Sequence, residues 1–433
     1  MEQRKKVAVL GLKDTGYFSA LFLAGKGYDV FASDSSVDED IVKNADSLRA
    51  KGIRTECGQH TFEEILAQDW ILISPGIPPS SEIYQKIQAA GKPVYSEIEV
   101  ASWFCKARTI VAVTGSCGKT TIATLIARIL KANGKKTVLC GNIGNPWIHE
   151  LSKINEQTSV VIEVSSFQLA HCASFAPNVG LLLNVFPNHM DWHADMREYT
   201  EAKLNLFRRM KKTDVMICRK EDENALFPDF KTAARYVYFD ERPANDPNEA
   251  ALLCAAEVLQ CPEAVVRQVL AEFQGLEHRL EKFTEQNGIA FVNDSKSTTP
   301  SSLAWAIEKY PDHKVVLICG GKAKSKDFEK LRDGVRQKVK SAILIGAARP
   351  LIRGAWNGAV TLTEASDFDH ACDLALECAS SGDTVLLSPA CASFDMFKNY
   401  QERGRLFKQK ISERLKAGAP KLKSGEASKH AKC

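Results

Sequence analysis

The most informative stretch of the 433-residue chain is Thr109-Ile-Val-Ala-Val-Thr-Gly115-Ser-Cys-Gly118-Lys119-Thr120-Thr121. Its β-branched, apolar start predicts a buried strand, and its glycines predict a tight turn after that strand. The residues that follow place apolar side chains at helical spacing until Asn133-Gly134, a typical helix stop. The stretch therefore predicts a strand, a turn and a helix, the unit from which parallel α/β sheets are built.

The turn has the chemistry of a phosphate-binding loop. Glycines let backbone N–H groups point at phosphate oxygens, and the helix N-terminus adds partial positive charge. Lys119 can reach the β- and γ-phosphates of a nucleotide, and the Thr120 hydroxyl can ligate Mg²⁺. Val113 replaces the first glycine of the full G-x-x-x-x-G-K-[ST] pattern, so a plain glycine turn is the alternative. We predict nucleotide binding, because a plain turn would not require Lys-Thr. The predicted loop residues are Gly115, Ser116, Cys117, Gly118, Lys119, Thr120 and Thr121.

Similar strand and helix patterns alternate along nearly the whole chain, which predicts an α/β protein with parallel sheets. They fall into three blocks, so we predict three α/β domains in series, at residues 1–106, 107–276 and 277–416, followed by a basic tail at 417–433. The tail has few large apolar residues, which predicts a solvated, disordered segment. The predicted strands are residues 6–11, 28–34, 70–74, 93–96, 109–114, 137–141, 159–164, 179–185, 289–293, 314–320, 342–346, 359–363 and 384–388.

The composition is that of an ordinary globular protein, with 45% hydrophobic and 25% charged residues. A net charge of +4 gives no case for binding nucleic acid or a membrane surface. The thirteen cysteines lie mostly in apolar runs without C-x-x-C spacing, which predicts reduced thiols. No apolar run is long enough to span a membrane. We expect a cytoplasmic monomer.

Three further residues suggest a metal site near the phosphate loop. Glu163 ends an apolar run that predicts a buried strand, and a buried carboxylate needs a partner such as Mg²⁺. His189 follows the next strand, and ligands in α/β sheets lie beyond the carboxyl ends of the strands. Lys203 falls on the helix after it. A capping role for His189 and a solvent-exposed Lys203 remain the alternatives.

A weaker glycine motif, Gly11-Leu-Lys-Asp-Thr-Gly16, follows the first strand. Lys13 replaces the glycine that lets a pyrophosphate approach the backbone of dinucleotide-binding proteins, so an NAD-dependent oxidoreductase is disfavoured. Asp34 ends the second strand, where a carboxylate can hold a ribose or a base. A nucleotide held differently, or an ordinary turn, remains open.

Several motifs follow one another in a characteristic order. After the phosphate loop come Gly141-Asn142-Ile-Gly144, Glu163-Val-Ser-Ser-Phe-Gln, Asn-His189-Met-Asp, Gly275-Leu-Glu-His278-Arg279, Asn293-Asp294-Ser-Lys296-Ser-Thr298 and Leu387-Ser-Pro-Ala-Cys-Ala-Ser393-Phe-Asp-Met-Phe397-Lys-Asn399-Tyr400-Gln-Glu-Arg403-Gly404. In this order they resemble the Mur ligase family over nearly all of the chain.

The resemblance implies a Rossmann-like N-terminal domain for a UDP-sugar, a P-loop-type central ATPase domain and a Rossmann-like C-terminal domain for an amino acid. The last motif is similar to that of family members that add D-glutamate. The implied reaction is ATP-dependent ligation of D-glutamate to UDP-N-acetylmuramoyl-L-alanine through an acyl phosphate, in peptidoglycan precursor synthesis. The implied cofactors are ATP and two Mg²⁺ ions.

The resemblance also implies roles for individual residues. Thr120 and Glu163 would hold the first Mg²⁺, and His189 the second together with a carbamylated Lys203, since CO₂ would turn that cation into an oxygen ligand. The catalytic group is Lys119, Glu163, His189 and Lys203. Asn245, Arg279 and Asp294 would contact ATP beside the phosphate loop. The UDP-sugar residues would be Asp14, Thr15, Asp34, Ser74, Pro75, Gly76, Asn142 and Ser165. Those for D-glutamate would be Thr298, Lys324, Ser393 and Tyr400, hydroxyls and a cation that suit two carboxylates.

Some positions depart from the family pattern. Cys117 stands where the family usually has asparagine, which predicts sensitivity to oxidation or alkylation. Ala244 and Ser36 stand where histidine and arginine are common, at the adenine and uracil contacts.

Two alternatives to this function remain. A sibling ligase for another amino acid, or a folate polyglutamate ligase, is disfavoured by residues 393–403 and by the lack of an Asp-Asn-Pro-Arg signature. A regulatory NTPase would leave Thr298, Lys324 and Ser393 unexplained.

Overall fold

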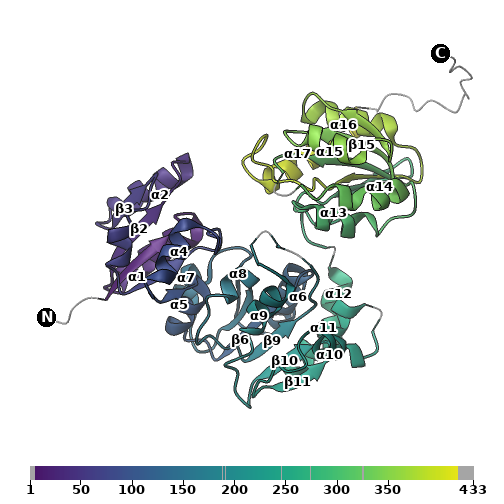
Figure 1. The fold of residues 1–433 in the computed structure, drawn as a ribbon. Coiled ribbons are helices and arrows are strands. Elements are labelled where there is room, and N and C mark those ends of the chain that lie inside the picture. The colour runs from purple at the N-terminus through teal and green to yellow at the C-terminus, as the bar shows by residue number, and fades with distance from the viewer. Residues whose placement is uncertain are drawn as a thin grey trace, which may run out of the picture. The chain divides into compact units, whose positions relative to one another are not determined.

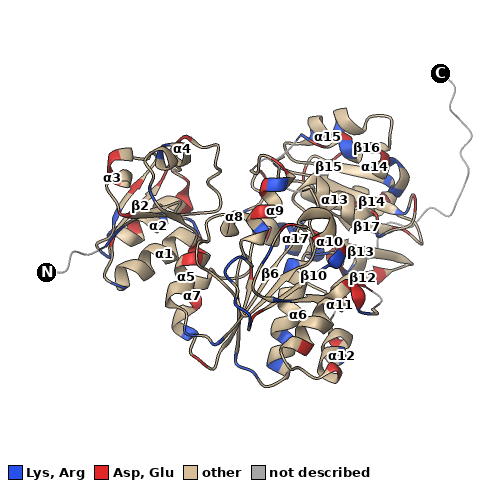
Figure 2. Ribbon diagram, turned by 60° about the horizontal axis from the view of Figure 1, so that its bottom comes forward, with Lys and Arg blue, Asp and Glu red and all other residues tan. Residues whose placement is uncertain are grey.

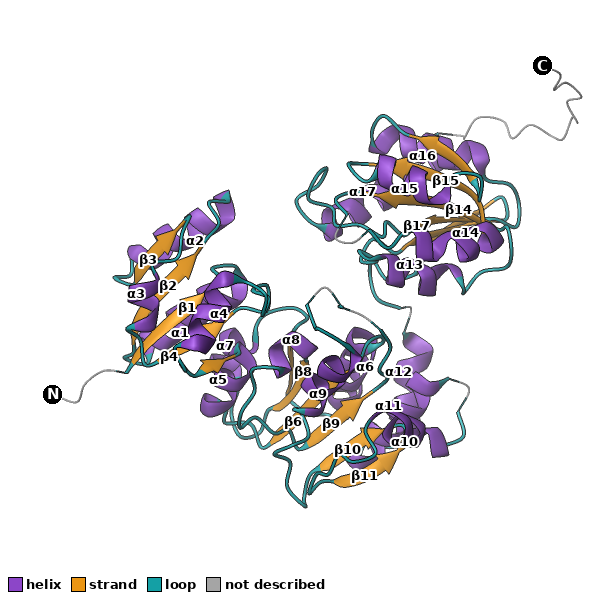
Figure 3. Cartoon of the chain, in the orientation of Figure 1, coloured by secondary structure: helices purple, strands orange, loops and turns teal. Residues whose placement is uncertain are grey.

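The computed structural model describes residues 5–417 apart from 188, 191, 245, 274, 324 and 325. The chain forms two compact units, Met1–Phe273 and Gln274–Cys433 (Figure 1). Three sheets with helices on their faces make up these units (Figure 3). The predicted α/β architecture is therefore confirmed.

The first sheet has the strand order β3-β2-β1-β4-β5, and all its pairs are parallel. Strands β1, β2 and β4 carry apolar residues on both faces, as expected for strands covered by helices on each side. Its strands are β1 Lys6–Leu10, β2 Asp29–Asp34, β3 Arg54–Cys57, β4 Trp70–Ile73 and β5 Val94–Tyr95. Its helices are α1 Asp14–Gly25, α2 Glu39–Arg49, α3 Phe62–Leu66, α4 Glu82–Ala89 and α5 Glu97–Phe104.

The second sheet, also parallel, has the order β11-β10-β9-β6-β8-β7 and belongs to the same unit. Its strands are β6 Thr109–Thr114, β7 Thr137–Gly141, β8 Ser159–Glu163, β9 Val179–Leu182, β10 Val215–Cys218 and β11 Arg235–Tyr238. Its helices are α6 Lys119–Ala132, α7 Trp147–Glu150, α8 Ser166–Leu169, α9 Met196–Leu204, α10 Lys220–Leu226, α11 Pro247–Val258 and α12 Glu263–Glu272, with short 3-10 helices at Leu151–Lys153 and Phe239–Glu241.

Helix α6 is fixed by the apolar face that the sequence predicts. Ile122, Ile126 and Ile129 are at most 2% exposed and pack between the sheet and helices α11 and α12. Burying a side chain of this size contributes about 1.5–3 kcal/mol. This packing holds the start of α6, and with it the phosphate loop, at the carboxyl end of β6.

Two buried glutamates of α5 join the first sheet to the second. The Glu97 carboxylate accepts a 2.6 Å bond from the Ile148 N–H at the start of α7. The Glu99 carboxylate accepts the N–H groups of Ala173, Ser174 and Phe175 at 2.9–3.1 Å. Glu97 thus holds the start of α7, which follows β7 of the second sheet. Glu99 holds residues 173–175, which follow β8 and α8.

The third sheet forms the core of the second unit, in the order β12-β13-β17-β14-β15-β16. It is parallel except for β12, which pairs antiparallel with β13. Its strands are β12 Glu281–Gln286, β13 Ile289–Asn293, β14 Val315–Gly320, β15 Val339–Ile345, β16 Thr361–Glu364 and β17 Thr384–Leu387. Its helices are α13 Pro300–Ile307, α14 Arg332–Lys338, α15 Arg349–Trp356, α16 Phe368–Cys378 and α17 Tyr400–Lys416, with a 3-10 helix at Glu329–Leu331.

Surface chemistry agrees with the balanced composition. Basic and acidic residues are interspersed along the elements of both units (Figure 2). The twelve cysteines in the described ranges are free thiols. Among the described residues, no helix is long and apolar enough to cross a membrane. The predicted tail from residue 418 onward lies outside the described residues.

Candidate active site

The phosphate loop joins β6 to α6 and adopts a conformation that needs its glycines. Gly118 has a φ of 82°, and a Cβ added there would lie 2.9 Å from Asn248 Oδ1. The Lys119 Nζ donates to the carbonyl oxygens of Gly115 at 2.8 Å and Ser116 at 3.1 Å. The loop is therefore folded around its own lysine, with Thr120 buried in the first turn of α6.

Asn184, beyond the end of β9, braces the same loop. Its Oδ1 accepts the N–H groups of Ser116 at 3.1 Å and Cys117 at 2.9 Å, and its Nδ2 donates to the Cys117 carbonyl at 3.2 Å. The Ser116 hydroxyl lies 3.0 Å from the Tyr199 hydroxyl. Asn184 was not among the predicted site residues, although a polar residue after the strand next to β6 is a signal that could have identified it.

Lys203 is buried beside this loop, so the solvent-exposed alternative is wrong. Its side chain is 1% exposed, its Nζ donates to the Gly115 carbonyl at 3.0 Å, and the same atom lies 4.3 Å from the centre of the Tyr199 ring. Burial, together with the nearby positive charge of Lys119, holds the pKa of Lys203 well below its usual range. Burial therefore works against a positive charge at this position.

Glu163 ends β8 beside the phosphate strand, in register with Val113. It is 2% exposed, and its Oε1 accepts a 2.9 Å bond from Asn142 Nδ2. Its Oε2 has no hydrogen-bond partner among the described residues. A buried carboxylate oxygen left unpaired is costly unless it binds a cation. Glu163 Oε2 is therefore suited to be a Mg²⁺ ligand.

The histidine region lies after β9. His189 has a φ of 59°, and its ring packs edge-on against Phe167, with centroids 4.7 Å apart. Ser165 caps α8 in a capping box with Gln168. A second histidine, His193, is 1% exposed and its Nε2 lies 2.9 Å from the Ser166 hydroxyl. His193 was missed, although its spacing of four residues from His189 is a recognisable signal.

The predicted UDP-sugar residues of the first sheet follow the carboxyl ends of β1, β2 and β4. Asp34 accepts the backbone N–H groups of Leu12 at 2.7 Å and Ser36 at 2.9 Å, so it shapes the glycine turn. The Ser74 hydroxyl donates to the Gly11 carbonyl at 3.2 Å. Asp14 and Thr15 begin α1, and Pro75 and Gly76 continue the loop after β4. A pocket of about 420 Å³ is lined by Ser35, His60, Phe62, Gly76, Ile77, Pro78, Ser81, Glu82 and Ile83.

In the second unit, Asp294 follows β13 and is 7% exposed. Its oxygens accept the Leu280 N–H at 3.2 Å and the Ser388 hydroxyl at 2.8 Å. Burial raises the pKa of Asp294 to about 6, while the charge of Arg279 works in the opposite direction. These contacts bring the predicted ATP residues Arg279 and Asp294 into one neighbourhood.

The predicted D-glutamate residues lie on two neighbouring loops. Thr298 follows β13 and Ser393 follows β17, and the Ala390 N–H donates to the Ser297 carbonyl at 2.9 Å between these loops. Tyr400 begins α17. Lys324 and the predicted ATP residue Asn245 lie outside the described residues.

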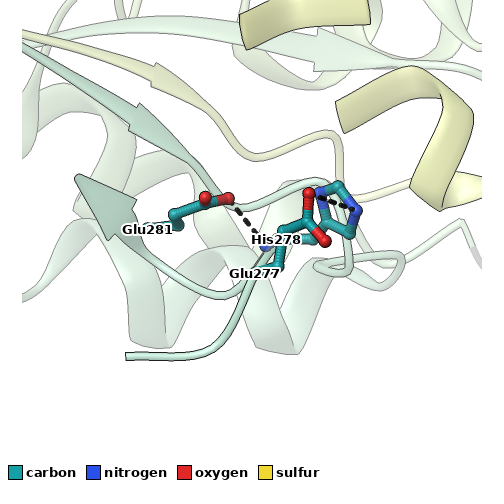
Figure 4. A group of neighbouring side chains, drawn as sticks. All are labelled: Glu277, His278 and Glu281. Atoms are coloured by element: carbon teal, nitrogen blue, oxygen red, sulfur yellow. Dashed lines mark hydrogen bonds and ion pairs between the residues drawn. The ribbon is translucent and has the colours of Figure 1, made fainter. Parts of the chain in front are cut away.

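Glu277, His278 and Glu281 bring potential metal-ligand atoms within 4.8 Å of one another (Figure 4). The Lys408 ammonium already bonds both carboxylates, at 2.9 Å to Glu277 and 2.7 Å to Glu281. Asn293 Nδ2, which also donates to Glu281, faces His278 Nδ1 at 2.9 Å. That contact occupies the Nδ1 lone pair of a neutral imidazole, whose proton then lies on Nε2. The cluster is therefore an anchor for the loop before β12.

Comparison with known proteins agrees with this architecture. Family models for the MurD-like N-terminal domain, the Mur ligase middle domain and the Mur ligase glutamate ligase domain match residues 5–96, 113–251 and 278–391. UDP-N-acetylmuramoylalanine–D-glutamate ligase of Chloroherpeton thalassium is 35% identical, over 94% of this chain and 98% of its own length. The relative of that name in Desulfovibrio desulfuricans is 36% identical, over 94% of this chain and 95% of its own length.

Solved structures support the fold. MurF ligase of Thermotoga maritima, solved in complex with ADP, aligns with a TM-score of 0.58 at 16% identity, covering 96% of this chain and 97% of its own. The resemblance in the sequence is thus confirmed by matches along almost the full chain. The chain belongs to the Mur ligase family, on its MurD-like branch.

Proposed function

We propose that the chain uses ATP to join D-glutamate to UDP-N-acetylmuramoyl-L-alanine, a step of peptidoglycan precursor synthesis. The observation that carries this proposal is the full-length similarity to relatives with that activity in their name, 35% identical over 94% of the chain. We assign the UDP-sugar, ATP and amino-acid functions to residues 1–106, 107–276 and 277–416. Free thiols in the described ranges support a reducing compartment, so we place the enzyme in the cytoplasm. We also propose that it acts as a monomer.

The reaction we propose has two steps. A carboxylate of the UDP-sugar peptide attacks the γ-phosphorus of ATP, releasing ADP and forming an acyl phosphate. The amine of D-glutamate then attacks the acyl carbon, and phosphate leaves as the amide forms. Phosphoryl transfer depends mainly on positioning and on neutralised charge. Lys119 would hold the phosphates once it exchanges its two carbonyl partners for phosphate oxygens.

Mg²⁺ would neutralise negative charge on the phosphates. Thr120 and Glu163 are our candidates for the first ion, supported by the unpaired Glu163 Oε2. His189 and Lys203 are our candidates for the second. The lowered pKa of Lys203 supports this, because a carbamate forms when a neutral amine attacks CO₂ and loses a proton.

We also propose roles for the remaining predicted site residues. Asn142, bonded to Glu163, and Ser165 would contact the sugar peptide. The remaining proposed UDP contacts are Asp14, Thr15, Asp34, Ser74, Pro75 and Gly76. Arg279 and Asp294, with Asn245, would contact ATP. The proposed D-glutamate contacts are Thr298, Ser393, Tyr400 and Lys324.

The test is phosphate release from Mg-ATP in the presence of UDP-N-acetylmuramoyl-L-alanine. D-Glutamate is compared with L-glutamate, L-alanine and diaminopimelate, and the product is identified by mass. We expect release that requires both the nucleotide-sugar and D-glutamate. Release with another amino acid would move the enzyme to a sibling activity, and release without any ligated product would overturn the ligase assignment.

A further inference from the structure

Arg403, in the first turn of α17, is a buried cation bound to two separate loops. Its side chain is 0% exposed. Its Nε donates to the Ser295 hydroxyl at 3.0 Å and its Nη2 to the Ser295 carbonyl at 2.8 Å, while its Nη1 donates to the Cys391 carbonyl at 3.2 Å. Burial lowers the pKa of Arg403 to about 10, so it remains charged at neutral pH. One planar group thus bridges the loops after β13 and β17.

Both loops lead to proposed D-glutamate contacts. Ser295 lies three residues before Thr298, and Cys391 lies two residues before Ser393. The Ser295 hydroxyl also donates to the Tyr400 carbonyl at 2.8 Å, which closes the network onto the start of α17. The Arg403 side chain thus links these two loops to one another and to the start of α17.

A third segment is tied to the same network. Lys322 and Ala392 exchange two backbone hydrogen bonds of 2.9 Å each, and Lys322 precedes the segment that holds Lys324. A Cβ at Gly321 would lie 2.4 Å from the Ala392 carbonyl oxygen and 3.4 Å from Arg403 Nη1. Three described segments, which follow β13, β14 and β17, thus meet around one guanidinium.

The chemistry requires arginine at this position. The three acceptors are uncharged oxygens that lie in different directions, and a guanidinium presents several donors in a fixed plane. A lysine would keep the charge but would concentrate its donors on one atom. Burying a cation against neutral acceptors carries a desolvation cost, which the geometry of three bonds must offset.

We propose that Arg403 is a positioning residue for the amino-acid substrate. It holds the loops of Thr298 and Ser393 at the separation that fits the two carboxylates of D-glutamate, without touching the substrate. The inference rests on the proposed function. It implies that loosening Arg403 weakens D-glutamate recognition and also its discrimination from a shorter dicarboxylate such as D-aspartate.

The test replaces Arg403 with lysine and uses Arg405→Lys as the matched control. Arg405 lies on the same helix and is exposed. For Arg403→Lys we expect the KM for D-glutamate to rise about tenfold, because lysine keeps the charge but its single amine cannot make all three bonds. The preference for D-glutamate over D-aspartate should also fall. The KM values for ATP and the nucleotide-sugar should change less than about twofold, as expected for sites that Arg403 does not contact. The control matches the wild type.

Thermal unfolding of each variant accompanies the kinetics. If Arg403→Lys does not fold, Ser295→Ala removes one of the three Arg403 bonds and the bond to the Tyr400 carbonyl, and we expect a smaller shift in the same direction. An unchanged KM for D-glutamate, or an equal loss toward all three substrates, would overturn the inference. The wild type in the same assay reports the proposed function separately, since absence of D-glutamate-dependent release there contradicts the function itself.

Discussion

Lys203 and Arg403 are both buried cations, but they are buried in different ways. Lys203 shares a single carbonyl oxygen with Lys119, and its pKa is held well below the usual range. Arg403 donates three bonds to three acceptor atoms and remains charged. A lysine that can lose its proton is suited to chemistry, whereas an arginine that cannot is suited to fixing geometry. Burial alone therefore does not distinguish a reactive residue from a structural one, and the hydrogen-bond partners do.

The sharpest test of this contrast is Lys203→Met, which keeps the length of the side chain and removes the amine. We expect kcat to fall by about 10²–10³, the usual cost of losing one charge-stabilising group. The melting temperature should stay the same or rise, because a costly buried amine is replaced by an apolar side chain. Steady-state kinetics and calorimetry on one preparation measure both effects. A large loss of stability would instead show that Lys203, like Arg403, mainly stabilises the fold.

Gly404→Ala tests the geometric side of the comparison. A Cβ at Gly404 would lie 2.3 Å from His278 Nδ1 and 2.9 Å from Asn293 Oδ1. We expect a loss of about 1–3 kcal/mol in the free energy of unfolding, measured by urea denaturation. Gly354→Ala is the control, because a Cβ there meets nothing within 4 Å on helix α15. Equal stability of the two variants would show that the Arg403 region tolerates displacement.

Glu97→Gln extends the comparison to a buried acid. Burial raises the pKa of Glu97 to about 7, from an ordinary value of 4.5. The folded state therefore favours the protonated carboxyl. Its contribution to stability is fully present below pH 4.5 and is lost as the pH rises toward 7. The full shift corresponds to at most about 3 kcal/mol at 1.36 kcal/mol per unit.

The variant should therefore lose less stability than the wild type between pH 5 and 8, by about 2 kcal/mol, because an amide does not titrate in this range. Urea unfolding across this pH range measures the difference between the variant and the wild type. Asp294, whose pKa is also raised, contributes equally to both proteins and cancels from this difference. Glu39→Gln, on the exposed surface of α2, should follow the wild type. Parallel curves for Glu97→Gln and the wild type would contradict the assignment.

Much of this molecule could be predicted from its sequence. The buried strands β1, β6 and β14 and the apolar face of α6 follow from local periodicity alone. The strands that were missed are β3, β10, β11 and β12. Strand β12, Glu-Lys-Phe-Thr-Glu-Gln, and strand β3, Arg-Thr-Glu-Cys, are charged edge strands, and charge is how edges avoid further pairing. An apolar pattern therefore does not identify them.

The site was less predictable than the fold. Glu163 could be found because a carboxylate at the end of an apolar strand is unusual. Lys203 could not be located from the mostly polar sequence of α9, because its burial depends on tertiary packing against Tyr199 and the phosphate loop. Asn184 contacts Cys117, 67 positions earlier in the chain, and Arg403 contacts Ser295, 108 positions earlier. No local sequence pattern contains such distant contacts.

The shared carbonyl of Gly115 has a thermodynamic consequence. A phosphate that draws the Lys119 ammonium away from this oxygen also removes the like charge beside Lys203. Nucleotide binding then favours the protonated form of Lys203, and by reciprocity the neutral amine weakens nucleotide binding. One backbone oxygen, the Gly115 carbonyl, thus couples the protonation state of Lys203 to the binding of a nucleotide at the phosphate loop.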